Sequence, residues 1–313
     1  MKKQLALIAV CVAVLAIAPF CGPLGPEDTN HFVFSQLRVP RMLVAAITGA
    51  TLGATGAAFQ ALFANPLATP STTGTTAGAA LGALIAFVLF PSTIAASGWG
   101  VAVLAFTGAL AVALPVSALA SRRNARIEDI LLAGIALTLA SGALTTGLQF
   151  QADATATRRA VLWSLGSLSQ VGYSGVAGVL PLCAIAIAGV LTQTRSLQTL
   201  VAGEERAFSQ GVNIPWTRTI VLVFGALGVA ACVAWCGPIA FVGLIVPHMV
   251  RRTLGPLLRH VMPFSCITGA AFLVACDTIG RLALGGRELP VGVITAAVGA
   301  PLLIFLILGK RRM

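Results

Sequence analysis

Residues 219–250 read TIVLVFGALGVAACVAWCGPIAFVGLIVPHMV, a long run that contains no Asp, Glu, Lys or Arg. About 20 apolar residues are enough for a helix to cross the hydrocarbon core of a bilayer. Gly237 and Pro238 interrupt the run, because neither residue favours a continuous helix. The stretch therefore predicts a membrane span over 219–235. A segment over 239–250 follows, too short to cross alone unless it begins earlier, and otherwise a half-helix.

The same apolar character extends over the whole chain of 313 residues, of which 58% are hydrophobic and 9% are charged. Soluble domains have about 25% charged residues, so this composition indicates a membrane protein. Backbone polar groups in lipid must be satisfied within each span, which favours helices. We expect an all-α polytopic membrane protein with one transmembrane domain over 1–313 and ten spans, at about 3–20, 41–62, 74–92, 99–120, 128–150, 174–193, 219–235, 239–250, 262–279 and 290–309.

The first apolar run has two interpretations. Met1-Lys2-Lys3 followed by apolar residues to Phe20 fits a cleavable signal peptide or a first span. Because no clear small-x-small cleavage site precedes Cys21, we expect an uncleaved span.

The placement of charge orients these spans. Fourteen of the 20 basic residues fall on the side of the two termini; the other six are Arg38, Arg41, Arg158, Arg159, Arg281 and Arg287. Positive residues concentrate on the cytoplasmic side, so both termini are expected there. Trp99, Trp163, Trp216 and Trp235 all fall at predicted span ends, as an interfacial belt in contact with lipid requires.

The net charge of +11 does not indicate a nucleic-acid binder, because the basic residues form short clusters between apolar runs rather than one polar face. The seven cysteines show no CxxC pair and no spacing to histidine that is typical of a metal site. We interpret them as small packing residues. No cofactor, resident metal or nucleic-acid partner is expected.

Acids are scarce, and only Asp277 falls well inside a predicted span. A proton-coupled transporter would normally carry several intramembrane carboxylates or histidines. Asp277 and Arg281 are four residues apart and can form a pair on one helix face. The only lysines are Lys2, Lys3 and Lys310, and none ends a phosphate-binding loop. No catalytic residue is therefore expected, and any ATP hydrolysis must come from another polypeptide.

Four local features suggest close packing or contact with partners. Gly49, Gly53 and Gly56 lie at spacings that allow close helix packing. Residues 158–170 are amphipathic and predict a short helix on the outer surface. Residues 203–214, within the loop 194–218, predict a short cytoplasmic helix ended by a glycine. Outer arginines, among them Arg38, Arg41 and Arg281, fit equally well lipid headgroups and an acidic partner.

Several motifs occur in an order that resembles one family. They are Arg38-Val-Pro-Arg41, Gln60 with Asn65-Pro66-Leu67-Ala68-Thr-Pro70, Leu162-Trp163-Ser-Leu-Gly166-Ser, Gly237-Pro-Ile-Ala-Phe241-Val-Gly243-Leu-Ile-Val-Pro247-His248, Asp277 with Arg281, Glu288-Leu289-Pro290-Val-Gly292 and Gly299-Ala-Pro301. Together they cover about residues 38–310. The chain thus resembles the iron-chelate, haem and vitamin B12 permease family of ABC importers, which have the type II permease fold.

The resemblance implies a permease in the bacterial inner membrane. It pairs with a second copy or a related paralogue around a central translocation path, with two cytoplasmic ATPase subunits and a periplasmic substrate-binding protein. The resemblance assigns ATPase coupling to Glu204, Glu205, Ala207 and Gly211 and docking of the binding protein to Arg38, Arg41 and Arg281. It places residues 158–170 at the outer mouth, and its candidates for the path are Gln60, Asn65, Pro66, Thr72, Thr73, Trp163 and Ser167.

The chain departs from the family pattern at Ser71-Thr-Thr-Gly-Thr-Thr76, where apolar residues are usual. These hydroxyls fit a wetter path for a hydrophilic chelate, or caps at a helix start. The expected cargo is a ferric siderophore, with haem and vitamin B12 as alternatives. A transporter driven by an ion gradient, or a channel, is an alternative interpretation from a different functional class. A membrane-embedded enzyme is disfavoured by the poor stock of acids and histidines.

Overall fold

The computed structural model describes residues 2–21, 32–93, 98–122, 125–169, 171–283 and 288–308. Helices dominate these ranges, and the described residues include no strand. The elements are α1 (Lys2–Ile17), η1 (Ala18–Phe20), η2 (Val33–Arg38), α3 (Val39–Leu62), η3 (Pro70–Thr73), α4 (Thr75–Leu89), α5 (Gly98–Ala120), α6 (Ile127–Gln151), α7 (Ala154–Ser164), α8 (Gly172–Thr192), α9 (Thr194–Leu200), α10 (Glu204–Ser209), α11 (Ile214–Cys236), α12 (Val242–Leu254), α13 (Leu258–Leu282) and α14 (Val291–Leu308).

Each of the ten predicted spans coincides with one helix, which confirms the all-α membrane architecture. Within the described ranges, seven helical segments are long and apolar enough to cross a membrane, and α4 and α14 are shorter apolar helices. The helix at the remaining predicted span, α12, has 13 residues. It begins only after a non-helical stretch at 237–241, so the predicted half-helix after Gly237-Pro238 is confirmed.

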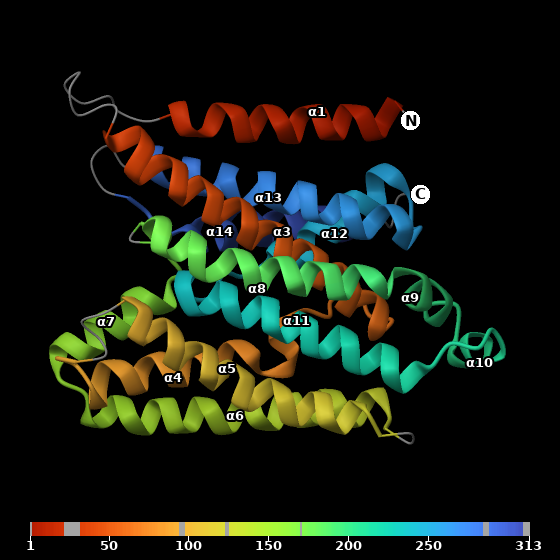
Figure 1. Ribbon diagram of the computed structural model, residues 1–313, viewed down its shortest axis with the longest axis horizontal. Helices are drawn as coiled ribbons and strands as arrows, with labels where there is room; N and C mark the ends of the chain where they lie inside the picture. Colours follow the sequence, from red (N-terminus) through yellow and green to blue (C-terminus); the bar gives the residue numbers. More distant parts are fainter. Residues whose placement is uncertain are drawn as a thin grey trace.

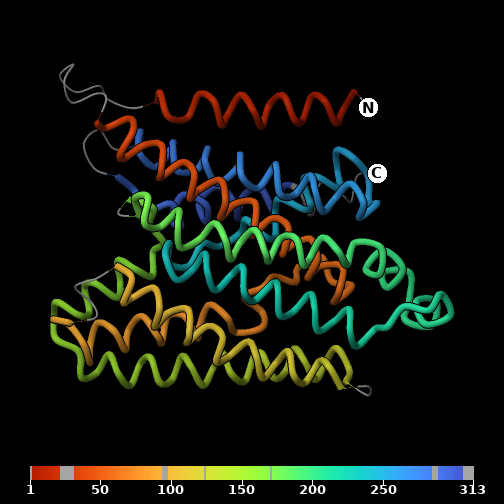
Figure 2. The backbone as a smooth tube through the Cα atoms, viewed as in Figure 1, coloured from red at the N-terminus to blue at the C-terminus, as the bar shows by residue number. Residues whose placement is uncertain are grey.

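The long helices lie roughly antiparallel, in a bundle with two recognisable ends (Figure 1). The start of α1 and the small helix α10 lie at one end, here called the α10 end, and α7 lies at the other, the α7 end. The tube in Figure 2 shows α8 and α11 between a group that contains α1 and α13 and a group that contains α4, α5 and α6. Helix α3 packs against α8, α11, α12 and α13 and forms the centre of the bundle.

Glycines allow α3 to pack closely against its neighbours. A Cβ atom added to Gly49 would lie 2.2 Å from the carbonyl oxygen of Gly269 on α13, and one on Gly56 would lie 2.0 Å from the carbonyl oxygen of Gly243 on α12. A real Cβ cannot approach a carbonyl oxygen that closely, so the two backbones touch only because these side chains are absent. The predicted close packing of this helix is confirmed.

The break between α11 and α12 packs against the chain that follows α7. A Cβ on Gly237, whose φ is +68°, would lie 2.3 Å from the carbonyl oxygen of Trp163. The Ser167 amide donates to the carbonyl of Cys236 at 2.8 Å, and the Gly292 amide donates to the carbonyl of Gly166 at 3.3 Å. The carbonyl of Cys236, at the end of α11, thus finds a partner within the protein.

Helix α7 overlaps the predicted short helix but is shifted toward the N-terminus. It was expected at 158–170 and runs from Ala154 to Ser164. Asp153 begins it, because its carboxylate accepts from the Ala156 amide at 2.6 Å and acts as an N-cap. Soon after its end, Gly166 adopts a φ of +69°, which is incompatible with helix continuation.

Candidate functional site

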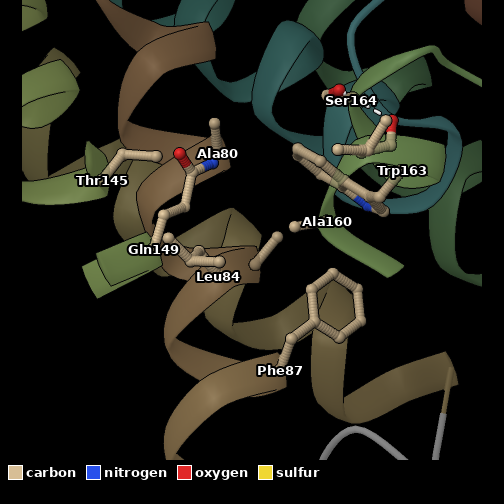
Figure 3. Close-up of a pocket in the computed structure, with 10 residues that line it drawn as sticks. Ala80, Leu84, Phe87, Thr145, Gln149, Ala160, Trp163 and Ser164 are labelled. Atoms are coloured by element: carbon tan, nitrogen blue, oxygen red, sulfur yellow. Dashed lines mark hydrogen bonds between the residues drawn. The ribbon is translucent and has the colours of Figure 1, made fainter. Parts of the chain in front are cut away.

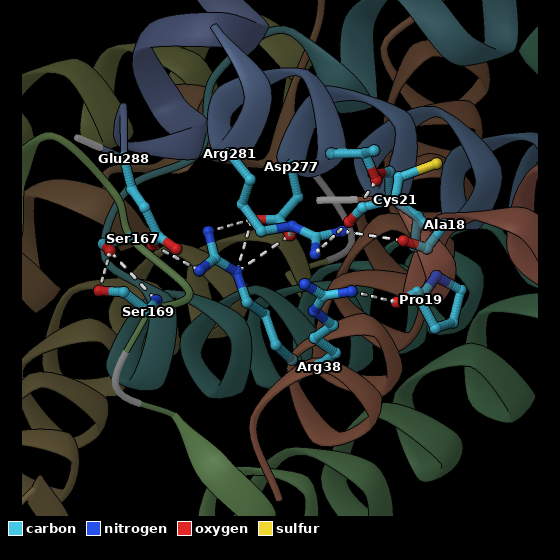
Figure 4. Close-up of polar contacts among 12 residues, drawn as sticks. Ala18, Pro19, Cys21, Arg38, Ser167, Ser169, Asp277, Arg281 and Glu288 are labelled. Atoms are coloured by element: carbon cyan, nitrogen blue, oxygen red, sulfur yellow. Dashed lines mark hydrogen bonds and ion pairs between the residues drawn. The ribbon is translucent and has the colours of Figure 1, made fainter. Parts of the chain in front are cut away.

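A cluster of charged side chains lies at the α7 end, where α3 begins and α13 ends (Figure 4). Arg41 donates from Nε to both carboxylate oxygens of Asp277 at 3.0 Å, and from Nη2 to Oδ1 at 2.8 Å. Its remaining nitrogen, Nη1, donates to Oε2 of Glu288 at 2.6 Å. Charge-assisted bonds of this kind are among the strongest that proteins make. One guanidinium therefore joins α3 both to α13 and to the segment that leads into α14.

The other two arginines of the cluster hold the end of the first helix. Nε of Arg281 lies 3.4 Å from Oδ2 of Asp277, which confirms the predicted pair one helical turn apart. Its Nη1 and Nη2 donate to carbonyl oxygens of the segment Ala18–Cys21 at 3.2 and 3.1 Å, and Nη1 of Arg38 donates to a third carbonyl there at 3.2 Å. The last carbonyls of a helix lack partners of their own and attract cations. Arg38 and Arg281 thus fasten the end of α1 and η1.

The side chains of this cluster differ in how far they are exposed to solvent. The side chains of Arg41, Arg281 and Asp277 are only 11%, 10% and 4% exposed, whereas that of Glu288 is 49% exposed. The structure therefore brings together the three arginines that were predicted to dock an acidic partner. It also shows that all three already have partners within this chain and that the side chains of Arg41 and Arg281 are only about a tenth exposed.

Gln60 has a role that its sequence position did not reveal. Pro247 has no N–H group, so the carbonyl of Gly243, four residues earlier on α12, loses its helical partner. Nε2 of Gln60 donates to that carbonyl at 3.3 Å and to the carbonyl of Leu244 at 3.1 Å. Its Oε1 accepts from Nη1 of Arg251. Gln60 is 3% exposed. Within the subunit, Gln60 therefore completes the hydrogen bonding of α12, and the predicted contact with the path stays a prediction.

The hydroxyl-rich segment after α3 uses its side chains locally. Thr72 and Thr73 donate to the carbonyls of Thr69 and Pro70 at 2.6 and 2.7 Å, within the turn η3. Thr73 is buried, and Gly74 rather than a hydroxyl residue occupies the N-cap of α4. The capping interpretation is therefore corrected to a self-bonded turn, and a path-facing role for Thr73 does not fit its burial.

The remaining predicted path residues lie at separate places. Asn65 and Pro66 are exposed in the turn between α3 and η3, where the Leu67 amide donates to Oδ1 of Asn65 at 2.9 Å. Trp163 and Ser167 lie at and after the end of α7 and are partly exposed. The candidates for the path therefore do not form one cluster within the subunit.

A small open pocket lies between α4, α6 and α7 (Figure 3). Its polar groups come mainly from α6 and α7, and its walls are apolar. Among the residues that line it are Leu84, Phe87, Thr145, Gln149, Ala160 and Trp163. Sequence analysis indicated Trp163 but missed Gln149, because a single glutamine in an apolar span carries no motif.

At the opposite end of the bundle, α10 forms the predicted short helix bounded by glycine. Gly203 and Gly211 have φ values of +119° and +77° on either side of it. The Val212 amide donates to the carbonyl of Ala207 at 3.0 Å, a bond typical of a glycine-terminated helix. Ala207 is fully buried, whereas Phe208 is 79% exposed. The helix is thus seated by one small residue and presents a large apolar one.

An ion pair ties α10 to the bundle. Nη2 of Arg218, on α11, donates to Oε1 of Glu204 at 2.5 Å, and its Nη1 donates to the carbonyl of Ala125 at 2.9 Å. The side chain of Arg218 is 4% exposed and that of Glu204 is 52% exposed, so a buried guanidinium holds a carboxylate that lies at the surface. Glu205 remains on the surface.

These features define a class of protein. Apolar helices in one bundle, a helical path interrupted between α11 and α12 and a small helix outside the bundle are features of a multi-pass membrane transport protein. The comparison with known sequences gives the family. The signature of the FecCD transport family matches residues 4–309. The chain belongs to this family, whose members are permeases of type II ABC importers.

Three relatives illustrate the range of the family. The cobalamin import system permease protein BtuC of Halobacterium salinarum is 38% identical over 92% of this chain and 77% of its own length. The vitamin B12 import system permease protein BtuC of Vibrio cholerae is 38% identical over 96% of this chain and 90% of its own. The Fe(3+) dicitrate transport system permease protein FecD of Escherichia coli is 35% identical over 98% of this chain and 95% of its own.

The fold agrees with a solved structure. A metal-chelate type ABC transporter in an inward-facing conformation superposes with a TM-score of 0.90, at 25% sequence identity, and covers 98% of this chain and 99% of that one. The expected type II permease fold is therefore confirmed.

Proposed function

We propose that this chain is the transmembrane subunit of a binding-protein-dependent importer that carries a metal chelate across the bacterial inner membrane. Two copies, or this chain and a related paralogue, enclose the path. Two ATPase subunits bind at the α10 end, which faces the cytoplasm together with both termini. A periplasmic substrate-binding protein docks at the α7 end, and lipid surrounds the apolar helices.

The observation that carries this proposal is α10. Its exposed residues offer a partner a contact surface, while Ala207 and the pair between Glu204 and Arg218 fix it to the bundle. A protein driven by an ion gradient would need no such element. The predicted coupling residues Glu204, Glu205, Ala207 and Gly211 all lie on α10 or in the turn that ends it.

The cargo proposed first is a ferric siderophore, supported by the relative named for Fe(3+) dicitrate. Cobalamin is a second candidate, because two relatives named for cobalamin or vitamin B12 are 38% identical to this chain. Both are metal chelates that a binding protein can capture before the permease meets them. The permease itself then needs little affinity for its cargo.

A reconstitution tests the proposal. The chain would be placed in liposomes with an ATPase subunit and a substrate-binding protein from the same operon, and uptake of radiolabelled ferric siderophore would be compared with uptake of labelled cobalamin. We expect uptake of one chelate only when ATP, the ATPase and the binding protein are all present. Accumulation by the chain alone under an ion gradient would contradict the proposal.

A further inference from the structure

The charged cluster at the α7 end contains more arginines than carboxylates. Arg38, Arg41 and Arg281 lie there with Asp277 and Glu288 (Figure 4). At neutral pH the described members of the cluster therefore carry one formal positive charge in excess. Nη1 and Nη2 of Arg41 each already hold a carboxylate by a charge-assisted hydrogen bond.

The two carboxylates of the cluster differ in how they are held. Asp277 is 4% exposed, accepts from two nitrogens of Arg41 and lies next to Arg281. Glu288 is 49% exposed and contacts Arg41 through Nη1 alone. Removal of one partner from a buried pair costs several kcal/mol, whereas a half-exposed pair contributes little. Asp277 is therefore a fixed part of the cluster, and Glu288 is the carboxylate that can leave.

The family resemblance already implies that Arg41 docks the substrate-binding protein. We propose that Glu288 is a built-in competitor for that contact: it occupies Nη1 of Arg41 and is replaced there by a carboxylate of the partner. This inference rests on the proposed function. The guanidinium of Arg41 is largely buried, so leaving Nη1 without a hydrogen-bond partner would cost free energy. Exchange of one carboxylate for another keeps its hydrogen bonds complete throughout docking, and the released Glu288 moves into water that already reaches it.

This arrangement explains how docking is kept reversible. Because Glu288 competes for the same guanidinium edge, the partner gains only the difference between two similar contacts. Affinity is thereby reduced, and the binding protein can leave after delivery. Glu288 thus tunes the affinity of the docking surface.

Glu288→Gln tests the exchange directly. The substitution keeps the side-chain shape and removes the competing charge, so the dissociation constant for the substrate-binding protein used in the reconstitution should fall about tenfold. Asp153→Asn is the matched control. It removes one negative charge at the same end, and asparagine still caps α7, so affinity should change less than about twofold. Unchanged or weaker binding of Glu288→Gln, with normal binding by the wild-type chain, would overturn the inference alone. No binding by the wild-type chain would instead overturn the proposed function.

A second comparison needs no partner. We expect Asp277→Asn to lower the midpoint of thermal unfolding of the purified chain by several degrees, and Glu288→Gln to lower it by less than about a third as much. Equal losses would make Glu288 a structural residue and overturn the inference. If Glu288→Gln does not fold, Glu288→Asp decides the binding question, because it keeps the charge on a shorter side chain. It should then bind the partner more tightly than the wild type, and unchanged affinity would overturn the inference.

Discussion

At the scale of single residues, the main lesson is that polar side chains inside this bundle complete the backbone and one another. Gln60 fills the gap that Pro247 leaves in α12 and accepts from Arg251. A buried carbonyl or guanidinium without a partner costs roughly 1–3 kcal/mol. Residues of this kind stabilise the fold, even where a motif suggests direct contact with cargo.

Gln60→Leu should therefore destabilise the protein by about 2 kcal/mol or more, because it leaves the Gly243 carbonyl and the Arg251 head group unsatisfied. The measurement is thermal unfolding of the purified chain in detergent. Gln149→Leu makes the same chemical change at an exposed position of α6 and should leave the midpoint nearly unaltered. Equal midpoints for both variants would show that Gln60 does not support α12.

Sequence analysis identified these residues better than their partners. The pair of Asp277 and Arg281 was predictable because one helical turn joins them. The contact of Arg41 with Asp277 spans 236 positions of the chain, and no local spacing encodes it. Gln60 belongs to a recognisable motif and Thr73 to a segment that departs from the family pattern, yet neither pattern says whether a side chain faces a path or the interior.

At the scale of elements, helices were predictable because an apolar run of sufficient length has few other stable structures in lipid. Boundaries were less accurate where a cap decided them. The outer helix was placed several residues too late because the capping role of Asp153 and the positive φ of Gly166 were overlooked. The break between α11 and α12 was predictable because glycine followed by proline marks it directly.

The contact between α3 and α13 gives a prediction at this scale. A Cβ on Gly53 would lie 2.2 Å from the carbonyl oxygen of Ser265, so Gly53→Ala must push the two helices apart. We expect a loss of about 1–3 kcal/mol in thermal unfolding. Gly147→Ala is the matched control, because a Cβ there meets nothing within 4 Å. Because alanine has a higher helix propensity than glycine, Gly147→Ala should leave the stability of the protein unchanged or slightly raised. A neutral Gly53→Ala would contradict the close packing.

At the scale of the whole molecule, the two ends of the bundle have different characters. The α10 end carries an anchored helix that presents Phe208, and the α7 end carries a charge cluster with Glu288 at its surface. In the proposed importer the ATPase subunits bind at the α10 end, and the substrate-loaded binding protein docks at the α7 end. The distribution of basic residues predicted this polarity from the sequence, and it is open to direct test.

Two single-cysteine substitutions test the orientation. Thr157→Cys lies on an exposed position of α7, and Ser209→Cys lies on an exposed position of α10. A membrane-impermeant maleimide should label the first from outside in spheroplasts and the second only in inside-out vesicles. Five of the native cysteines are buried, which keeps the background low, and the unsubstituted chain measures the rest. The reverse labelling pattern would invert the proposed topology.

The shared guanidinium of Arg41 has a consequence for the history of the family. A carboxylate at position 277 is tolerable in the interior only while a cation stands at position 41, and the cation is likewise tolerable only with its counter-charge. Substitution at one position alone would pass through a poorly folded intermediate. Across relatives the two positions should therefore vary in concert, with neutral pairs replacing charged ones together.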